Sequence, residues 1–158
     1  MRKLTARESA ARRCCLSKQT KKTLELKLRG KGFSEEEIAS SVKAMEENGY
    51  IDEDAYARAF VKDSYTIKKH GHIRIINELV LRGISQTKAE EAVLDYAADE
   101  RSIIREVMEK RFYKNYDNAK ILRYFYSRGF EADDVRRCID EYKSRNDIAR
   151  MLEESDRF

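Results

Sequence analysis

The chain has 158 residues, and 39% of them are charged, against a usual share of about 25%. This length suits one compact domain or a short array of repeats, while so much charge excludes a single thick spherical core. The charge is nearly balanced, with 33 basic and 29 acidic residues, which argues against a disordered polyelectrolyte. No apolar run follows the basic start or reaches the length of a membrane span, so we expect a soluble, cytoplasmic protein.

Apolar residues recur at helical spacing along the chain, and no stretch alternates with the period of two that a strand requires. There is no proline, and the glycines lie where one periodic stretch ends or the next begins, as helix C-terminal caps do. Two capping boxes mark helix starts, Thr5 with Glu8 and Ser34 with Glu37. We therefore predict an all-α protein with helices at 4–16, 20–30, 34–48, 52–68, 72–82, 86–97, 99–113, 117–128 and 132–143.

One pattern occurs three times, around Gly32, Gly83 and Gly129, which are 51 and 46 residues apart. Apolar residues stand eight and four positions before each glycine and one, six and ten positions after it. This spacing describes a helix that ends at the glycine and a second helix with one buried face. The buried positions that it predicts are Leu24, Leu28, Phe33, Ile38, Val42, Ile75, Leu79, Ile84, Ala89, Val93, Ile121, Phe125, Phe130, Val135 and Ile139.

A further amphipathic helix precedes each pair, so each unit is a three-helix bundle. Units of this size are too small to be stable alone and stack on their neighbours. We therefore predict three tandem three-helix repeats that form an elongated, curved helical array. The predicted repeats are residues 1–49, 50–97 and 98–143, and residues 144–158 form a C-terminal tail or a short extra helix.

Charge follows the same repeat. Residues 1–32 carry 11 basic and 2 acidic side chains, whereas residues 33–57 carry 1 and 8. The two later units alternate in the same order, so stacked repeats would have a basic face and an acidic face. Acidic residues near helix starts also complement helix dipoles, which explains part of the pattern. The excess of Lys and Arg predicts a surface that binds a polyanion or an acidic protein.

Catalytic and metal-binding patterns are not apparent. His70 and His72 are the only histidines, and two residues cannot complete a metal site alone. Three cysteines without ligand spacing indicate reduced thiols, and we expect Cys14 and Cys15 to serve in packing. Acidic pairs lie at expected helix ends, without the burial that tunes a catalytic carboxylate. We predict a protein that is not an enzyme and holds no metal or cofactor.

Basic and aromatic residues interleave over residues 110–116 and continue at Lys120, Arg123, Tyr124 and Tyr126. Such mixing can bind single-stranded nucleic acid through phosphate contacts and base stacking. The alternative is that the phenylalanines are core and the tyrosines half-buried, with their hydroxyls in water. We favour the alternative for most of the aromatic residues and keep the basic ones as candidates.

Four short stretches carry a family resemblance. Residues 49–61, GYIDEDAYARAFV, are similar to the pattern G-Y-[IL]-[DN]-D-x-x-[YF]-A-x-x-[FW], and residues 71–84, GHIRIINELVLRGI, to G-x-x-x-I-x-x-E-L-x-x-[KR]-G-I. Residues 28–33 and 123–130 are similar to two further L-x-x-[KR]-G-[FY] elements. In this order and at this spacing, over roughly residues 7 to 142, the stretches resemble the RecX family, bacterial regulators of the RecA recombinase.

The resemblance implies three tandem three-helix repeats and binding to the filament of RecA on single-stranded DNA. It further implies inhibition of strand exchange and of the RecA ATPase, by blocking filament growth or promoting disassembly, in recombination and DNA repair. We expect the chain to be a monomer. Residues 49–60 would then join the first two repeats structurally.

We predict that filament and DNA contacts come from the basic helices. The candidates are Lys21, Lys22, Lys27, Arg29, Lys68, Lys69, Arg74, Arg82, Lys110, Lys114, Lys120 and Arg123. Two other functions remain open: a general nucleic-acid-binding protein that acts without RecA, and a helical adaptor that docks another protein through its acidic helices.

Overall fold

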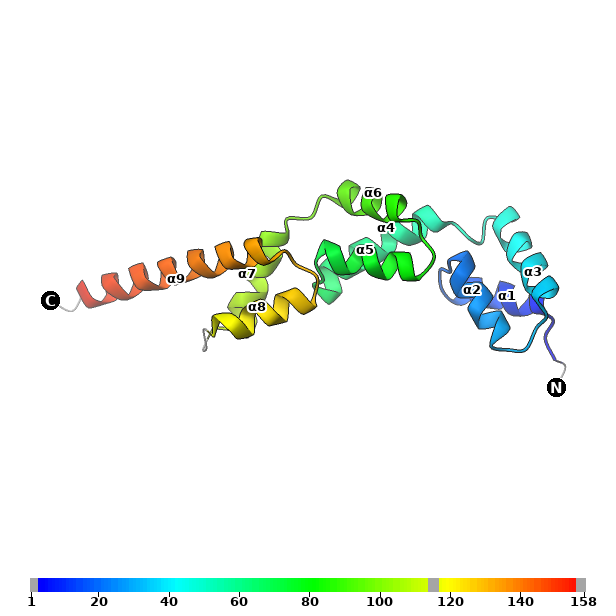
Figure 1. The fold of residues 1–158 in the computed structure, drawn as a ribbon, viewed down its shortest axis with the longest axis horizontal. Helices are drawn as coiled ribbons and strands as arrows, with labels where there is room; N and C mark the ends of the chain where they lie inside the picture. The colour runs from blue at the N-terminus through cyan, green and yellow to red at the C-terminus, as the bar shows by residue number, and fades with distance from the viewer. Residues whose placement is uncertain (1–2, 114–116, 156–158) are drawn as a thin grey trace. The chain divides into compact units, whose positions relative to one another are not determined.

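The computed structural model describes residues 3–113 and 117–155. Nine α-helices follow one another in this part, with a short π-helix, η1, after the fourth (Figure 1). Their bounds are α1 Ala6–Leu16, α2 Lys21–Arg29, α3 Glu35–Glu47, α4 Glu53–Asp63, η1 Ser64–Lys68, α5 His72–Leu81, α6 Gln86–Tyr96, α7 Glu100–Arg111, α8 Asn118–Ser127 and α9 Ala132–Ser155. No strand occurs among these residues, and the predicted all-α class is confirmed.

Most helices agree with their predicted ranges to within two residues at each end, but two helices differ by more. The helix expected over 52–68 ends at Asp63 and gives way to η1, after which Lys69 adopts the left-handed conformation with φ 54°. The last helix does not end at 143 but continues as α9 to Ser155. The reason lies in the sequence of its second half, which contains neither glycine nor proline and is rich in good helix formers.

Side-chain caps fix the helix starts of the N-terminal region. Thr5 Oγ1 accepts from the backbone N–H of Glu8, and Glu8 Oε2 accepts from the backbone N–H of Thr5 at 2.8 Å. Ser34 and Glu37 form the same reciprocal pair at the start of α3, so both predicted capping boxes are confirmed. A third box, in which Thr20 caps α2, was not predicted from the sequence.

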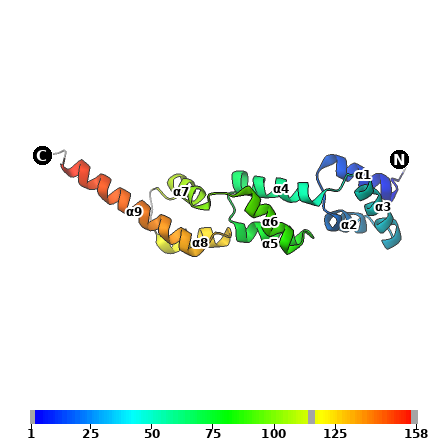
Figure 2. The same cartoon turned by 90° about the horizontal axis from the view of Figure 1, so that it is seen from above.

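The chain forms two compact units. Unit 1 comprises the chain up to Lys62 together with Ile76–Tyr96, and unit 2 comprises Asp63–Ile75 and the chain from Ala97 onward. The division therefore passes through α5. In unit 1, α1 packs against α2 and α3 (Figures 1 and 2). In unit 2, α7 and α8 both pack against α9.

Each unit has its own apolar core. In unit 1 the core residues are Ala10, Leu24, Leu28, Ile38, Val42, Met45 and Ile51. In unit 2 they are Ile104, Met108, Phe112, Ile121, Phe125, Phe130, Val135, Cys138 and Ile139. The side chain of Phe125 is central to the second core and meets the ring of Phe130 edge to face, at 5.4 Å between centroids.

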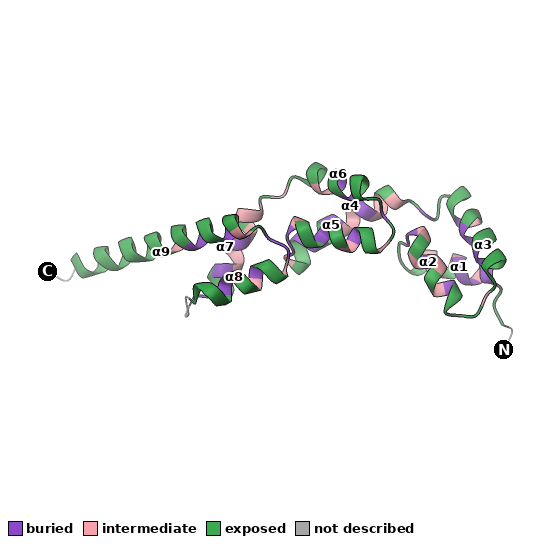
Figure 3. Cartoon of the chain, in the orientation of Figure 1, coloured by how far each residue is buried: buried purple, intermediate pink, exposed green. Residues whose placement is uncertain are grey.

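The burial pattern agrees with the repeat that the sequence predicted. Figure 3 shows buried stretches along the helices of both units. Of the fifteen predicted positions, Phe33 and Val93 are half-buried and all the others are buried. The prediction that both Cys14 and Cys15 serve in packing was wrong for Cys15. Cys14 packs at the edge of the unit 1 core, but Cys15 is exposed. The next residue of a helix points about 100° away, so Cys15 leaves the face that Cys14 shares with Ala10.

The three repeat glycines all have positive φ, and two of them allow a matched stability test. Gly129, with φ 85°, lies against the backbone of Arg74, whereas Gly32, with φ 84°, has nothing near the place of a Cβ. Gly32→Ala is therefore expected to cost only the left-handed strain, about 1 kcal/mol. Gly129→Ala is expected to cost about 3 kcal/mol or more, because a steric clash with backbone is added. Urea unfolding of both variants checks this, and equal losses would contradict it.

Candidate nucleic-acid interface

Two of the candidate cations of unit 1 form short ion pairs with acidic residues. Lys21 Nζ lies 2.6 Å from Glu46 Oε1, so helix α2 is tied to α3 at this point. Arg29 makes a two-pronged pair with Glu35, from Nε at 2.7 Å and from Nη2 at 2.8 Å. The hydrogen bond from Arg29 lowers the pKa of the Glu35 carboxyl. These two cations are largely neutralised locally.

The other unit 1 candidates have three different settings. Lys27 Nζ donates to Gln19 Oε1 at 2.7 Å, and burial lowers the pKa of this lysine. The guanidinium of Arg82 lies over the ring of Phe60, 4.7 Å from its centroid, and its Nη1 lies 3.8 Å from Glu78 Oε2. Lys22 is exposed and makes no side-chain hydrogen bond or ion pair with any residue that the structure describes. Of the three, Lys22 is the most available to a ligand.

In unit 2, Lys69 and Lys110 share one carboxylate. Lys110 Nζ lies 2.7 Å from Glu106 Oε1, and Lys69 Nζ lies 2.9 Å from Glu106 Oε2. The hydrogen bonds from Lys110 and then from Lys69 lower the pKa of Glu106 to about 2. Because one negative charge faces two positive ones, the trio keeps a net charge of one, and Glu106 competes with any incoming anion.

Glu106→Gln is expected to raise the affinity of the chain for single-stranded DNA. The substitution removes the competing carboxylate and adds the equivalent of one phosphate contact. With a salt slope of about 0.7 per contact on single strands, the gain is about fivefold at 0.1 M salt. Fluorescence anisotropy with a labelled oligonucleotide measures it. An unchanged or weakened affinity would show that Lys69 and Lys110 do not face the nucleic acid.

The same carboxylate is expected to make stability depend on pH in a defined window. Its pKa in the folded chain, about 2, is below the ordinary 4.5, so its contribution is complete above about pH 4.5. This contribution is lost as the pH falls from 4.5 toward 2. Thermal unfolding of wild type and Glu106→Gln over this window should therefore converge at its acid end, and parallel curves would contradict the assignment.

Lys120 and Arg123 form the most accessible candidate pair. Both lie on α8 at a spacing of three, which places their side chains side by side on one face of the helix. Both are exposed, and neither forms an ion pair with a carboxylate of the described residues. Arg123 Nε donates to the carbonyl of Ala119, at 3.4 Å. We call Lys120 and Arg123 the α8 cations.

The remaining candidates are spread around the start of α5. Lys68 is exposed, and its carbonyl accepts from Arg128 Nη1 at 3.1 Å. Arg74 is also exposed and donates from Nη1 to the carbonyl of Ser127 at 3.1 Å. Lys114 lies outside the described residues.

The aromatic residues near the α8 cations divide into two groups. Phe112 and Phe125 are buried in the core of unit 2, as predicted. Tyr113 and Tyr126, by contrast, are 56% and 76% exposed, and the ring of Tyr126 is available for stacking. Tyr116 lies outside the described residues. Tyr126 follows Arg123 by one helical step of three, which sets an exposed ring beside an exposed guanidinium.

The histidine pair has a structural setting. Glu100 accepts from the backbone N–H of His72 at 2.6 Å and from the Tyr65 hydroxyl at 2.9 Å, and lies 3.1 Å from His72 Nδ1. These contacts tie the start of α5 to α7 within unit 2. In residues 3–113 and 117–155, no three His, Cys, Asp or Glu side chains gather in a way that could hold a metal ion.

Three cations that the sequence analysis did not single out line a pocket in unit 1. They are Arg12, Arg13 and Lys31, and the same pocket is lined by Ser9 and Leu16. The spacing of Ser9, Arg12, Arg13 and Leu16 on one helix was a usable signal, but only the fold brings Lys31 to them. Within the described chain, no helix is long and apolar enough to cross a membrane.

Comparison with known proteins identifies the relatives of this fold. A family model described as "RecX, second three-helix domain" matches residues 52–93. Regulatory protein RecX of Halorhodospira halophila is 31% identical over 135 residues, which cover 82% of this chain and 83% of that protein. The chain belongs to the RecX family. The resemblance that the four sequence stretches predicted is thereby confirmed.

Two further relatives bear on length and fold. Regulatory protein RecX of Caldanaerobacter subterraneus is 30% identical over 123 residues, which cover 77% of this chain but only 62% of that protein. The crystal structure of RecX from Lactobacillus salivarius has a TM-score of 0.68 at 22% identity, over 86% of this chain and 93% of the other. This likeness shows a shared all-helical fold and is consistent with a helical repeat array.

Proposed function

We propose that the chain binds RecA and its filament on single-stranded DNA and lowers RecA's recombinase and ATPase activity. It acts by blocking filament growth or promoting disassembly, as a monomer in the cytoplasm, and needs neither catalysis nor a cofactor. Membership of the RecX family carries this proposal, because the relatives are named regulatory proteins.

The distribution of cations supports a filament surface as the target. The α8 cations are exposed without acidic partners in the described part, and Tyr126 beside them offers a ring for stacking. Lys22 offers a further exposed charge on unit 1. On a filament that carries single-stranded DNA, such cations would contact phosphates and such a ring would stack on a base.

Three repeats would provide the binding surface in this proposal. We infer a first repeat over residues 1–49, a second over 50–97 and a third over 98–143, followed by the segment 144–158. The family model supports the second of these, since it describes one three-helix domain over residues 52–93. Within the third, α7, α8 and α9 share one core.

The test is the single-stranded-DNA-dependent ATPase of the cognate RecA, with the chain titrated in after filaments have formed. We expect a progressive fall of the rate at substoichiometric amounts of the chain, since capping or disassembly affects many subunits per molecule bound. A fall that needs one molecule per RecA would favour coating instead. An unchanged rate at moderate salt would reject the proposal.

A further inference from the structure

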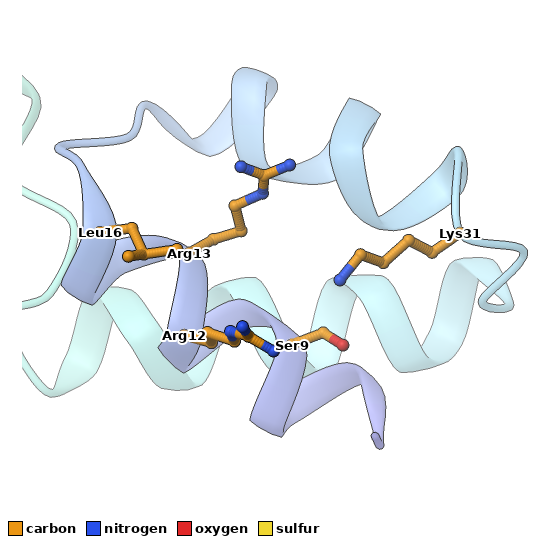
Figure 4. A pocket seen from close by; sticks show the side chains of 5 residues that line it. All are labelled: Ser9, Arg12, Arg13, Leu16 and Lys31. Atoms are coloured by element: carbon orange, nitrogen blue, oxygen red, sulfur yellow. The ribbon is translucent and has the colours of Figure 1, made fainter. Parts of the chain in front are cut away.

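A small pocket in unit 1 lies between α1 and the loop that follows α2. Its lining consists of Ser9, Arg12, Arg13 and Leu16 from α1 and Lys31 from the loop, and its volume is about 240 Å³ (Figure 4). Pockets that hold drug-sized ligands measure about 300–1,000 Å³. This one is therefore suited to a single small group and not to a whole nucleotide.

The positive charges around the pocket are not compensated within the described part of the chain. Arg12, Arg13 and Lys31 make no ion pair there, although Arg29 of the same unit is fully paired with Glu35. The first 32 residues contain 11 basic side chains and only 2 acidic ones. One of the two acids, Glu8, is engaged in the cap of α1.

A fourth cation shows how closely these charges crowd. Lys27 lies on α2, and burial first and the charge of Arg13 second lower its pKa. Its ammonium donates a hydrogen bond to the neutral side-chain amide of Gln19, at 2.7 Å. Like charges at this proximity repel one another, and an anion in the pocket would relieve that repulsion.

Ser9 adds a neutral donor to the pocket. The residue is only 2% exposed, and its side chain lines the pocket. Figure 4 shows the Ser9 hydroxyl and the Lys31 ammonium facing the same opening. Figure 4 shows the Arg13 guanidinium extending away from Ser9 and Lys31, so the donors near the opening are those of Arg12, Lys31 and Ser9.

We propose that this pocket binds a backbone phosphate of a nucleic-acid strand. Arginine forks match the paired oxygens of a phosphate, and a phosphate group suits the pocket volume. Leu16, 69% exposed at the rim, provides an apolar edge for the adjoining sugar. For its setting in a RecA filament the inference rests on the proposed function, but binding of bare oligonucleotide tests the pocket by itself.

The test compares two triple variants of the full chain with equal changes in net charge. One is Arg12→Gln, Arg13→Gln and Lys31→Gln in the pocket. The control is Arg137→Gln, Lys143→Gln and Arg150→Gln on the exposed surface of α9. Anisotropy of a labelled thirty-nucleotide oligo-dT, without RecA, is expected to show about fivefold weaker binding for the pocket variant at 0.1 M salt, and a salt slope lower by about 0.7. Circular dichroism checks that both variants stay folded.

Each outcome either supports or overturns the proposal that the pocket binds a backbone phosphate. Weaker binding by the pocket variant alone supports the inference. Displacement of oligo-dT by inorganic pyrophosphate from wild type, but not from the pocket variant, supports it as well. Equal weakening in both variants, or no oligo-dT binding by wild type at low salt, overturns it. A pocket variant that loses poly-glutamate binding but keeps oligo-dT binding identifies an acidic-protein site and also overturns it. RecA ATPase inhibition, measured on the same samples, reports separately on the proposed function.

Discussion

Phe125→Ala is expected to lower the free energy of unfolding by about 3–5 kcal/mol, as truncation of a buried phenylalanine generally does. Phe125 is fully buried in unit 2, and its ring lies 5.2 Å from Tyr124 and 5.4 Å from Phe130, centroid to centroid. The substitution removes these edge-to-face contacts and leaves a cavity between α8 and α9. Since domains are stable by only about 5–15 kcal/mol, much of the protein should unfold at moderate temperature.

The next residue of the same helix gives a matched control. Tyr126 is 76% exposed, so Tyr126→Ala removes an aromatic ring without opening a cavity. Its effect on the free energy of unfolding should stay within about 0.5 kcal/mol. Urea unfolding followed by circular dichroism measures both variants. Similar losses for the two would mean that α8 does not pack as the structure has it.

The sequence predicted the helices and the core well because both follow from local spacing. Each apolar residue four or eight positions before a repeat glycine had to lie on the face that the helix buries, and Leu24 and Leu28 do so completely. Two details were out of reach. The division of the chain within α5 depends on packing between distant segments. The π-helix η1 ends at a left-handed residue that is Lys69 and not glycine, so the sequence carries no signal for this turn.

The binding surface could be predicted only in part, because charge counts do not show which charges are paired. Lys21 and Glu46 are distant in sequence, and so are Lys69 and Glu106, yet each pair is in contact in the fold. A block with excess positive charge therefore contains both neutralised and available cations. The pocket of Arg12, Arg13 and Lys31 was missed because helical spacing describes only its α1 side, and the fold alone brings Lys31 there.

The double variant Lys120→Gln and Arg123→Gln is expected to weaken binding of single-stranded DNA about 25-fold at 0.1 M salt. The estimate assumes two phosphate contacts, each with a salt slope of about 0.7. The α8 cations have no carboxylate partner within residues 3–113 and 117–155, so their loss removes available charge and leaves no buried group unpaired. Stability should change little, because both side chains are exposed.

Salt dependence separates a direct contact from a general change of charge. Lys143→Gln with Arg150→Gln makes the same change in net charge on exposed positions of α9, in the same unit. If the α8 cations contact phosphates, their variant lowers the salt slope by about 1.4 while the control keeps it. Equal slopes for both variants would mean that α8 attracts the strand only at long range.

The ring of Tyr126 is tested separately. If the ring stacks on a base, the single variant Tyr126→Phe should keep the affinity for single-stranded DNA, whereas Tyr126→Ala should weaken binding by about 1–3 kcal/mol.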